Sequence, residues 1–226
     1  MADSDYRPTD RRPIASRDWT VSRHCAEWLT RRRVSPNAIS IFGMFAACAA
    51  GGCLAATALV AAPWDRACWL AAAILIPVRL LANLFDGMVA VAGGTASPVG
   101  ELYNDVPDRI SDAAVLVGAG YASGGDVALG FGAACVALFA AYVRNVGKAA
   151  GAKHEYCGPM AKQQRMAVVA GVAVYLALAP ESWQPIWNRP PTAGLIAAGL
   201  CVIILGGIVT AARRLGRIAN QLRNRS

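Results

Sequence analysis

NLFDGMVA, residues 83–90, is followed after a short spacer by GELYNDVPD, residues 100–108. The two stretches place acids and amides at neighbouring ends of two long apolar segments, near 67–91 and 101–122. A charged side chain inside a membrane-spanning helix costs about 2.5–3.5 kcal/mol on insertion scales. A cluster of such residues therefore needs a function, and these two stretches mark a candidate site.

The composition indicates a membrane protein. The chain has 226 residues, of which 56% are hydrophobic and 16% charged, whereas soluble domains average about 25% charged residues. This excludes a disordered chain, a collagen-like fibre and a disulfide-stapled secreted miniprotein. The net charge of +8 has no nucleic-acid-binding motif behind it, so we expect no nucleic-acid partner.

We expect an all-α integral membrane protein, a bundle of six transmembrane helices preceded by an amphipathic interfacial helix. The expected spans are about 39–61, 67–91, 101–122, 126–147, 164–180 and 192–212. The first span carries small residues at four-residue spacing (Gly43, Ala47, Gly51), which is typical of a helix-packing face.

The segment before the first span mixes tryptophan and arginine between Arg17 and Arg33, which predicts a helix lying on the membrane surface. The alternative is an ordinary solvated basic arm. Residues 1 to about 15 predict a disordered tail. The expected division is a tail with a juxtamembrane helix (1–33), a six-helix membrane domain (34–213) and a basic cytoplasmic tail (214–226).

Lysine and arginine are distributed unevenly among the connections. Eight lie in the segment up to Arg33, five in 144–165 and five in the tail from Arg213. The other connections hold only Arg66 and Arg189. With six spans the basic segments share one side, so the positive-inside rule predicts that both termini are cytoplasmic.

The cysteines do not predict a metal or redox site. There are seven, none in a C-x-x-C pair, and the two histidines are far apart in the sequence. Cysteine as a small buried hydrophobe accounts for them better.

Helical periodicity gathers the polar residues of the two stretches onto facing sides of their helices. One face of the second span carries Arg79, Asn83, Asp86 and Ala90, and one arc of the third span carries Glu101, Asn104, Asp105, Asp108 and Asp112. Carboxylate and amide oxygens without histidine or cysteine suit Mg²⁺, Mn²⁺ or Ca²⁺. The alternative is a helix end that merely solvates its acids, with Arg109 pairing Asp105 or Asp112; this accounts poorly for Asp86.

These stretches resemble the signature of the CDP-alcohol phosphotransferase family, D-x2-D-G-x2-A-R, a spacer, then G-x3-D-x3-D. The spacing from Asp86 to Gly100 and on to Asp108 fits that signature without a gap. SPN at 35–37 and YVR at 142–144 also resemble the family, so the likeness covers nearly the whole chain from about residue 20.

The resemblance implies transfer of a phosphatidyl group from a CDP-linked lipid, such as CDP-diacylglycerol, to an acceptor alcohol, with release of CMP. It implies Mg²⁺ or Mn²⁺, two ions, bound by Asn83, Asp86, Asn104 and Asp108, with Asp108 also the general base. Residues without bulk would lie against the nucleotide: Gly87, Ala90 and Gly100. The candidates for holding the acceptor are Arg144, Lys148, Lys162 and Arg165, although the positive-inside rule alone accounts for them equally well. The glycine-rich faces permit a homodimer among membrane lipids.

Three positions depart from the signature. Two family aspartates are Asn83 and Asn104 here, and the arginine after Ala90 is Val91. Two negative charges are thus lost, for which Glu101, Asp105 or Asp112 would compensate as auxiliary acids. The pattern resembles a divergent bacterial subgroup, which implies the bacterial inner membrane.

Two alternative functions stay open from the sequence. One is a catalytically silent homologue that binds CDP-lipid or metal, and the other is a small transporter. The acids gather at one membrane face and no inverted repeat is evident, which argues against a transporter.

Overall fold

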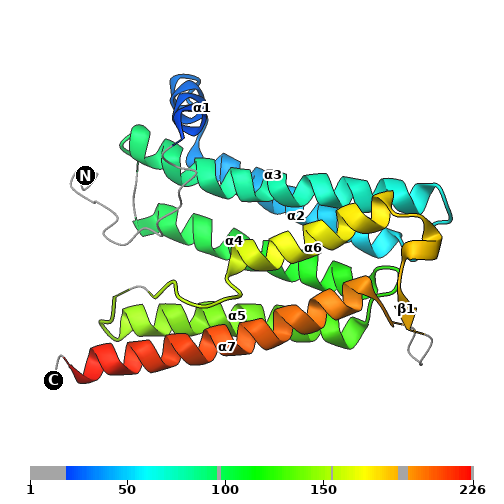
Figure 1. Cartoon of the computed structure of the whole chain (residues 1–226). Helices are drawn as coiled ribbons and strands as arrows, with labels where there is room; N and C mark the ends of the chain where they lie inside the picture. Colours follow the sequence, from blue (N-terminus) through cyan, green and yellow to red (C-terminus); the bar gives the residue numbers. More distant parts are fainter. Residues whose placement is uncertain (1–18, 96–97, 154, 188–192, 225–226) are drawn as a thin grey trace.

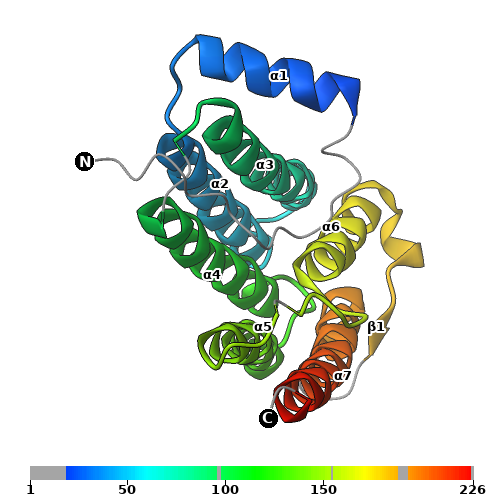
Figure 2. The ribbon, with the colours of Figure 1, turned by 90° about the vertical axis from the view of Figure 1, so that its left-hand side faces the viewer.

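The protein is described here by a computed structural model that covers residues 19–95, 98–153, 155–187 and 193–224. Its elements in chain order are α1 (Thr20–Arg31), α2 (Pro36–Ala56), α3 (Trp64–Ala92), α4 (Pro98–Tyr121), α5 (Val127–Ala149), α6 (Lys162–Leu178), the 3-10 helix η2 (Glu181–Trp183), β1 (Ile186–Trp187), β2 (Ala193–Gly194) and α7 (Leu195–Arg223). Helices α2 to α7 run lengthwise in a bundle, and α1 crosses one end of it (Figures 1 and 2).

The boundary between α1 and α2 follows from its residues. Arg33 adopts a left-handed backbone conformation (φ 57°), which turns the chain after α1. The Ser35 hydroxyl then accepts a hydrogen bond from the backbone N–H of Ala38 at 3.1 Å, and Pro36 occupies the first helical turn. These two features end α1 and start α2 as separate helices.

Small residues bring α2 and α4 together at backbone distance. A Cβ added to Gly51 would lie 2.3 Å from the carbonyl oxygen of Ala114, and one added to Gly118 would lie 2.3 Å from that of Gly51. Only glycine fits such an approach. The predicted packing face of the first span is thus confirmed, and α4 packs far more extensively on α2 than on α3, its neighbour in the chain.

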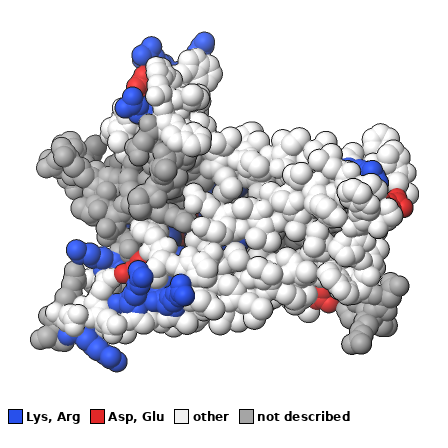
Figure 3. Space-filling model, viewed as in Figure 1, with Lys and Arg blue, Asp and Glu red and all other residues white. Residues whose placement is uncertain are grey.

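Four helices of the described chain, α2, α3, α5 and α7, are long and apolar enough to cross a membrane. Helix α4 carries several charged residues, and α6 has only 17 residues. These two expected spans are therefore not among the helices whose length and composition suit a membrane crossing. Lysine and arginine gather at the end of the bundle where α1 lies and α7 finishes, while the length of the bundle in this view is almost free of charge (Figure 3).

The last helix of the bundle extends into the segment expected as a basic tail. Helix α7 continues to Arg223, so Arg214, Arg217 and Arg223, which are expected in a basic tail, lie on the last helix of the bundle. Its Arg214 is buried, and the guanidinium donates hydrogen bonds to backbone carbonyls of Cys157 and Ala140. The predicted interfacial helix corresponds to α1, and the predicted disordered tail lies outside the described residues.

Candidate active site

Three helices meet at one oxygen of Asp108 on α4. Its Oδ1 accepts hydrogen bonds from the Arg79 guanidinium of α3, from the Asn83 amide of α3 at 3.0 Å and from the Lys162 ammonium of α6 at 2.6 Å. The Asp108 side chain keeps 13% of its surface exposed. This acid is therefore surrounded by donors and is still open to solvent.

The other signature positions lie beside Asp108. The Asn83 amide also donates to Oδ1 of Asn104 at 2.9 Å, which links α3 to α4. Asp86, one turn along α3 from Asn83, is buried; its Oδ2 accepts from the Ser40 hydroxyl of α2 at 2.6 Å, and its Oδ1 from the backbone N–H of Gly87 at 2.6 Å. The predicted facing arrangement of the second and third spans is present.

Arg79 is a buried arginine under the site. Besides Asp108, its guanidinium donates from Nε to the Ser111 hydroxyl at 2.9 Å. Gly43 of α2 provides the room, since a Cβ there would lie 2.7 Å from Arg79 Nη1. The sequence places Arg79 on the correct face but assigns it no role. An arginine within an apolar span is the signal that could have found it, because such charges face partners inside a bundle.

A second ion pair lies one turn further along α4. Asp112 accepts from Arg165 of α6 at 2.7 Å, and their side chains are only 1% and 5% exposed. Arg165 also donates to the backbone carbonyl of Met160 at 3.1 Å. The sequence makes Arg165 a candidate for holding the acceptor, but in the fold it is buried and paired with Asp112.

The loop before α6 is fastened to α7. The backbone N–H of Met160 donates to the Thr210 hydroxyl at 3.0 Å, and Arg214 Nε donates to the carbonyl of Cys157 at 3.1 Å. Gly158 has φ 122° and lies against Thr210, where a side chain would collide. These contacts fix the chain just before Lys162 and so direct its ammonium to Asp108.

A third group of charges lies around Asp105 and is more exposed. Asp105 accepts from Arg144 of α5 at 3.0 Å and from Arg109 at 3.3 Å. Lys148, another predicted acceptor residue, is exposed near the end of α5. The three predicted nucleotide-contacting residues are half-buried, on α3 or in the first turn of α4: Gly87, Ala90 and Gly100. The side chain of Glu101 lies outside the described residues.

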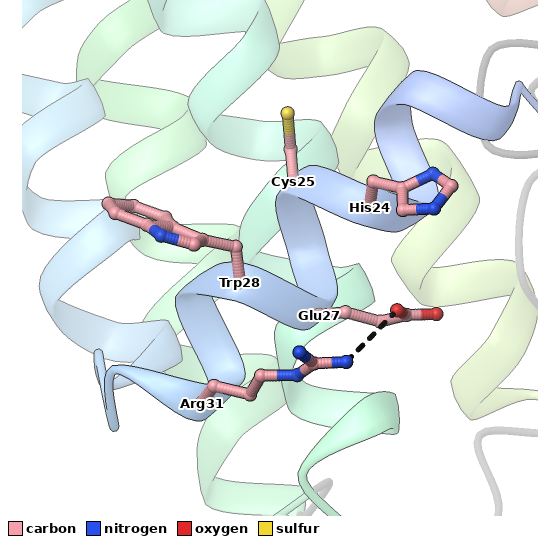
Figure 4. A pocket seen from close by; sticks show the side chains of 5 residues that line it. All are labelled: His24, Cys25, Glu27, Trp28 and Arg31. Atoms are coloured by element: carbon pink, nitrogen blue, oxygen red, sulfur yellow. Dashed lines mark ion pairs between the residues drawn. The ribbon is translucent and has the colours of Figure 1, made fainter.

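A recess of about 380 Å³ lies on α1 rather than in this cluster. It is lined by His24, Cys25, Glu27, Trp28 and Arg31, and Figure 4 shows these side chains along α1, with the Glu27–Arg31 ion pair of 4.0 Å. None of the predicted site residues lines it, so this recess does not belong to the candidate active site.

The oxygen atoms near Asp108 bear on whether a divalent cation could bind there. Within the described ranges no three His, Cys, Asp or Glu side chains gather as a metal site. The Asp86 carboxylate and the amide oxygens of Asn83 and Asn104 are nevertheless the hard donors that Mg²⁺ and Mn²⁺ prefer. Asp108 already has two cations against one oxygen. The residues therefore offer the donor chemistry of a divalent ion.

Comparison with solved structures finds the phosphatidylinositol phosphate synthase (PgsA1) of Mycobacterium tuberculosis. Its form with CDP-DAG bound superposes with a TM-score of 0.68 at 19% identity, covering 88% of this chain and 94% of that one. This chain has the fold of that synthase. The form in complex with manganese and citrate gives 0.66 at 20% identity (87% and 88% covered), and the apo form 0.64 at 20% (85% and 93% covered). No family model and no curated protein matches the sequence.

Proposed function

We propose that this protein transfers a phosphatidyl group from a CDP-linked lipid, such as CDP-diacylglycerol, to an acceptor alcohol and releases CMP. The observation that carries the proposal is the contact of Asn83, Asn104 and Asp108 across α3 and α4, in the order and spacing of the CDP-alcohol phosphotransferase signature. The shared fold supports it, because the Mycobacterium tuberculosis synthase was solved with CDP-DAG bound.

In the proposed reaction the acceptor hydroxyl attacks the phosphorus that carries the diacylglycerol. A bond forms between that oxygen and phosphorus, the bond from phosphorus to the CMP oxygen breaks, and the hydroxyl proton passes to Asp108. Asp108 is suited to this step because it is held in place by Lys162 and Arg79 yet stays partly exposed. Lys162, which is partly exposed, would face the negative charge of the pyrophosphate.

A divalent ion, Mg²⁺ or Mn²⁺, would be held by Asp86 with the amide oxygens of Asn83 and Asn104. When bound, it would neutralise charge on the pyrophosphate. Two ions are what the family resemblance implies, and the cations already facing Asp108 favour a single ion. The manganese complex of the Mycobacterium tuberculosis synthase supports a divalent metal in this fold.

We further propose a multi-pass protein of a bacterial inner membrane with both termini in the cytoplasm. The gathering of lysine and arginine at one end of the bundle supports this orientation (Figure 3). The lipid tails would stay in the bilayer, while the nucleotide and the acceptor reach Asp108 from the charged end.

The test is CMP release by the purified full-length chain from CDP-diacylglycerol, with Mg²⁺ or Mn²⁺ and a pool of acceptor alcohols. We expect acceptor-dependent CMP that is lost in Asp86→Asn and kept in Glu181→Gln, an exposed acid in η2. CMP release that is unaffected by Asp86→Asn would contradict the assignment.

A silent homologue is the second candidate, favoured by the two amides at Asn83 and Asn104. Such a protein would bind CDP-diacylglycerol without releasing CMP under either metal, and the binding would respond to Asp86→Asn. The same purified variants therefore distinguish the two functions.

A further inference from the structure

Ser40 lies on α2, a helix that carries none of the predicted site residues, and it contacts the acid Asp86 on α3. Its hydroxyl donates to Oδ2 of Asp86 at 2.6 Å, although the two residues are 46 positions apart in the chain. Ser40 and Asp86 are each only 2% exposed. The hydrogen bond is therefore shielded from water, and it connects α2 to the candidate active site.

The Asp86 carboxylate is held at both of its oxygens. Oδ2 accepts from Ser40, and Oδ1 accepts from the backbone N–H of Gly87 at 2.6 Å. A carboxylate offers about four lone-pair positions, so two hydrogen bonds leave it able to bind a metal ion. The two donors thus fix the orientation of the carboxylate and preserve its capacity as a ligand.

Asp86 differs from the three other acids at the site because no cation of the protein lies beside it. Within the described part of the chain, no lysine or arginine nitrogen lies within 4.0 Å of the Asp86 carboxylate. Each of the other acids has such a partner: Asp105 with Arg144, Asp108 with Lys162 and Asp112 with Arg165. Burying a carboxylate is costly unless it is hydrogen-bonded and paired. The position of Asp86 therefore suits a cation that the chain itself does not supply.

The packing of α2 on α3 does not depend on the Ser40 hydrogen bond. Three residues further along α2, Gly43 lies so close to α3 that an added Cβ would be 2.7 Å from Ala82 Cβ. The Ser40 hydroxyl also has an acceptor on its own helix, the carbonyl of Pro36 at 3.3 Å. Its bond to Asp86 is the shorter one. We therefore look for its role at Asp86 and not in helix cohesion.

We infer that Ser40 is a positioning residue that orients Asp86 to bind a divalent ion. The inference rests on the proposed function, which assigns Asp86 to the metal, and it makes α2 a third helix of the metal site. Hydrogen-bond partners of metal ligands typically contribute about 10- to 100-fold to metal affinity. Removal of the Ser40 hydroxyl would leave Oδ2 without its donor and the carboxylate free to turn.

The experiment measures Mn²⁺ binding to the purified full-length chain, from the electron paramagnetic resonance signal of free Mn²⁺. Ser40→Ala should raise the dissociation constant by about 10- to 100-fold, and Ser40→Thr, which keeps the hydroxyl, should bind nearly as tightly as the wild type. Thr57→Val is the matched control. It removes a buried hydroxyl at the other end of α2, one that accepts from the backbone N–H of Ser123 at 2.9 Å, and should leave the affinity unchanged.

The number of Mn²⁺ ions bound per chain separates positioning from folding. A variant that only folds less well would bind fewer ions with unchanged affinity, whereas a misplaced ligand weakens the affinity itself. Equal dissociation constants for Ser40→Ala and the wild type would overturn the inference. So would equal losses of affinity in Ser40→Ala and Thr57→Val, or a wild type that binds no Mn²⁺.

CMP release by the same variants distinguishes this inference from the proposed function. Ser40→Ala should need a higher Mn²⁺ concentration than the wild type to reach half of its maximal rate. If Ser40→Ala weakens Mn²⁺ binding but neither it nor the wild type releases CMP with any acceptor, the transferase is wrong and the role of Ser40 stands.

Discussion

Asp108 and Asp112 lie one turn apart on α4 and both face cations from α6, yet their surroundings differ. Asp108 is partly exposed and takes hydrogen bonds from three side chains on two helices, whereas Asp112 is sealed and pairs with Arg165. The comparison distinguishes an acid that a substrate can reach from an acid that only stabilises the fold. An acid that stays partly accessible can exchange a proton with a substrate, while a sealed pair only holds one helix against another.

The largest expected effect is on turnover. Asp108→Asn should lower CMP release by roughly 10²–10⁴-fold, because the amide cannot take the acceptor's proton. The melting temperature should also fall, because the buried Arg79 loses its carboxylate partner, so CMP release is compared per folded molecule, with folding checked by thermal unfolding in detergent. The control is Glu181→Gln at the opposite end of the bundle. If Asp108→Asn kept its turnover, Asp108 would not be the general base and would be a structural acid like Asp112.

Arg165→Met should instead lower the free energy of unfolding by about 3–5 kcal/mol, because it leaves the Asp112 carboxylate buried without its cation. The double variant Asp112→Leu with Arg165→Met should recover most of that loss, since a buried pair can be replaced by apolar residues at little cost. Denaturant unfolding in detergent measures both. If Arg165→Met were as stable as the wild type, the Asp112–Arg165 pair would not stabilise the fold.

A substitution at Gly43 tests the packing of Arg79, the buried residue that hydrogen-bonds Asp108. Gly43→Ala would bring a Cβ within 2.7 Å of both Arg79 Nη1 and Ala82 Cβ, so we expect a loss of about 1–3 kcal/mol in stability and a parallel fall in CMP release. Gly52→Ala, on the same helix, meets nothing within 4 Å and should be neutral or stabilising. Equal behaviour of the two variants would contradict the packing of Arg79 against α2.

The smallest effect is expected outside both regions. Ser35→Ala removes the cap of α2 and should cost about 1 kcal/mol of stability, with CMP release per folded molecule unchanged. Ser35→Asp keeps a capping oxygen and should restore the stability. A fall in turnover would mean that the cap of α2 also governs the site.

The parts of the fold that depend on residue spacing along one helix can be predicted from the sequence. The period of the helix places Asn83 and Asp86 on one side and Asn104 and Asp108 on another, and the glycine spacing of α2 predicts its packing face. What it could not supply is the choice of partner between helices. Arg144 and Arg165 look like free cations in the sequence, but Asp105 and Asp112 hold them in the fold. Such pairs depend on the rotation and depth at which helices pack.

Helix α4 also bears on how the chain enters the membrane. Its acids at 108 and 112 complete their pairing only with Lys162 and Arg165, more than 50 positions later in the chain. Because α4 is not among the helices apolar enough to span a membrane by length and composition, we expect its stable insertion to await the arrival of α6 from the ribosome. A chain truncated before α6 would therefore leave α4 poorly integrated.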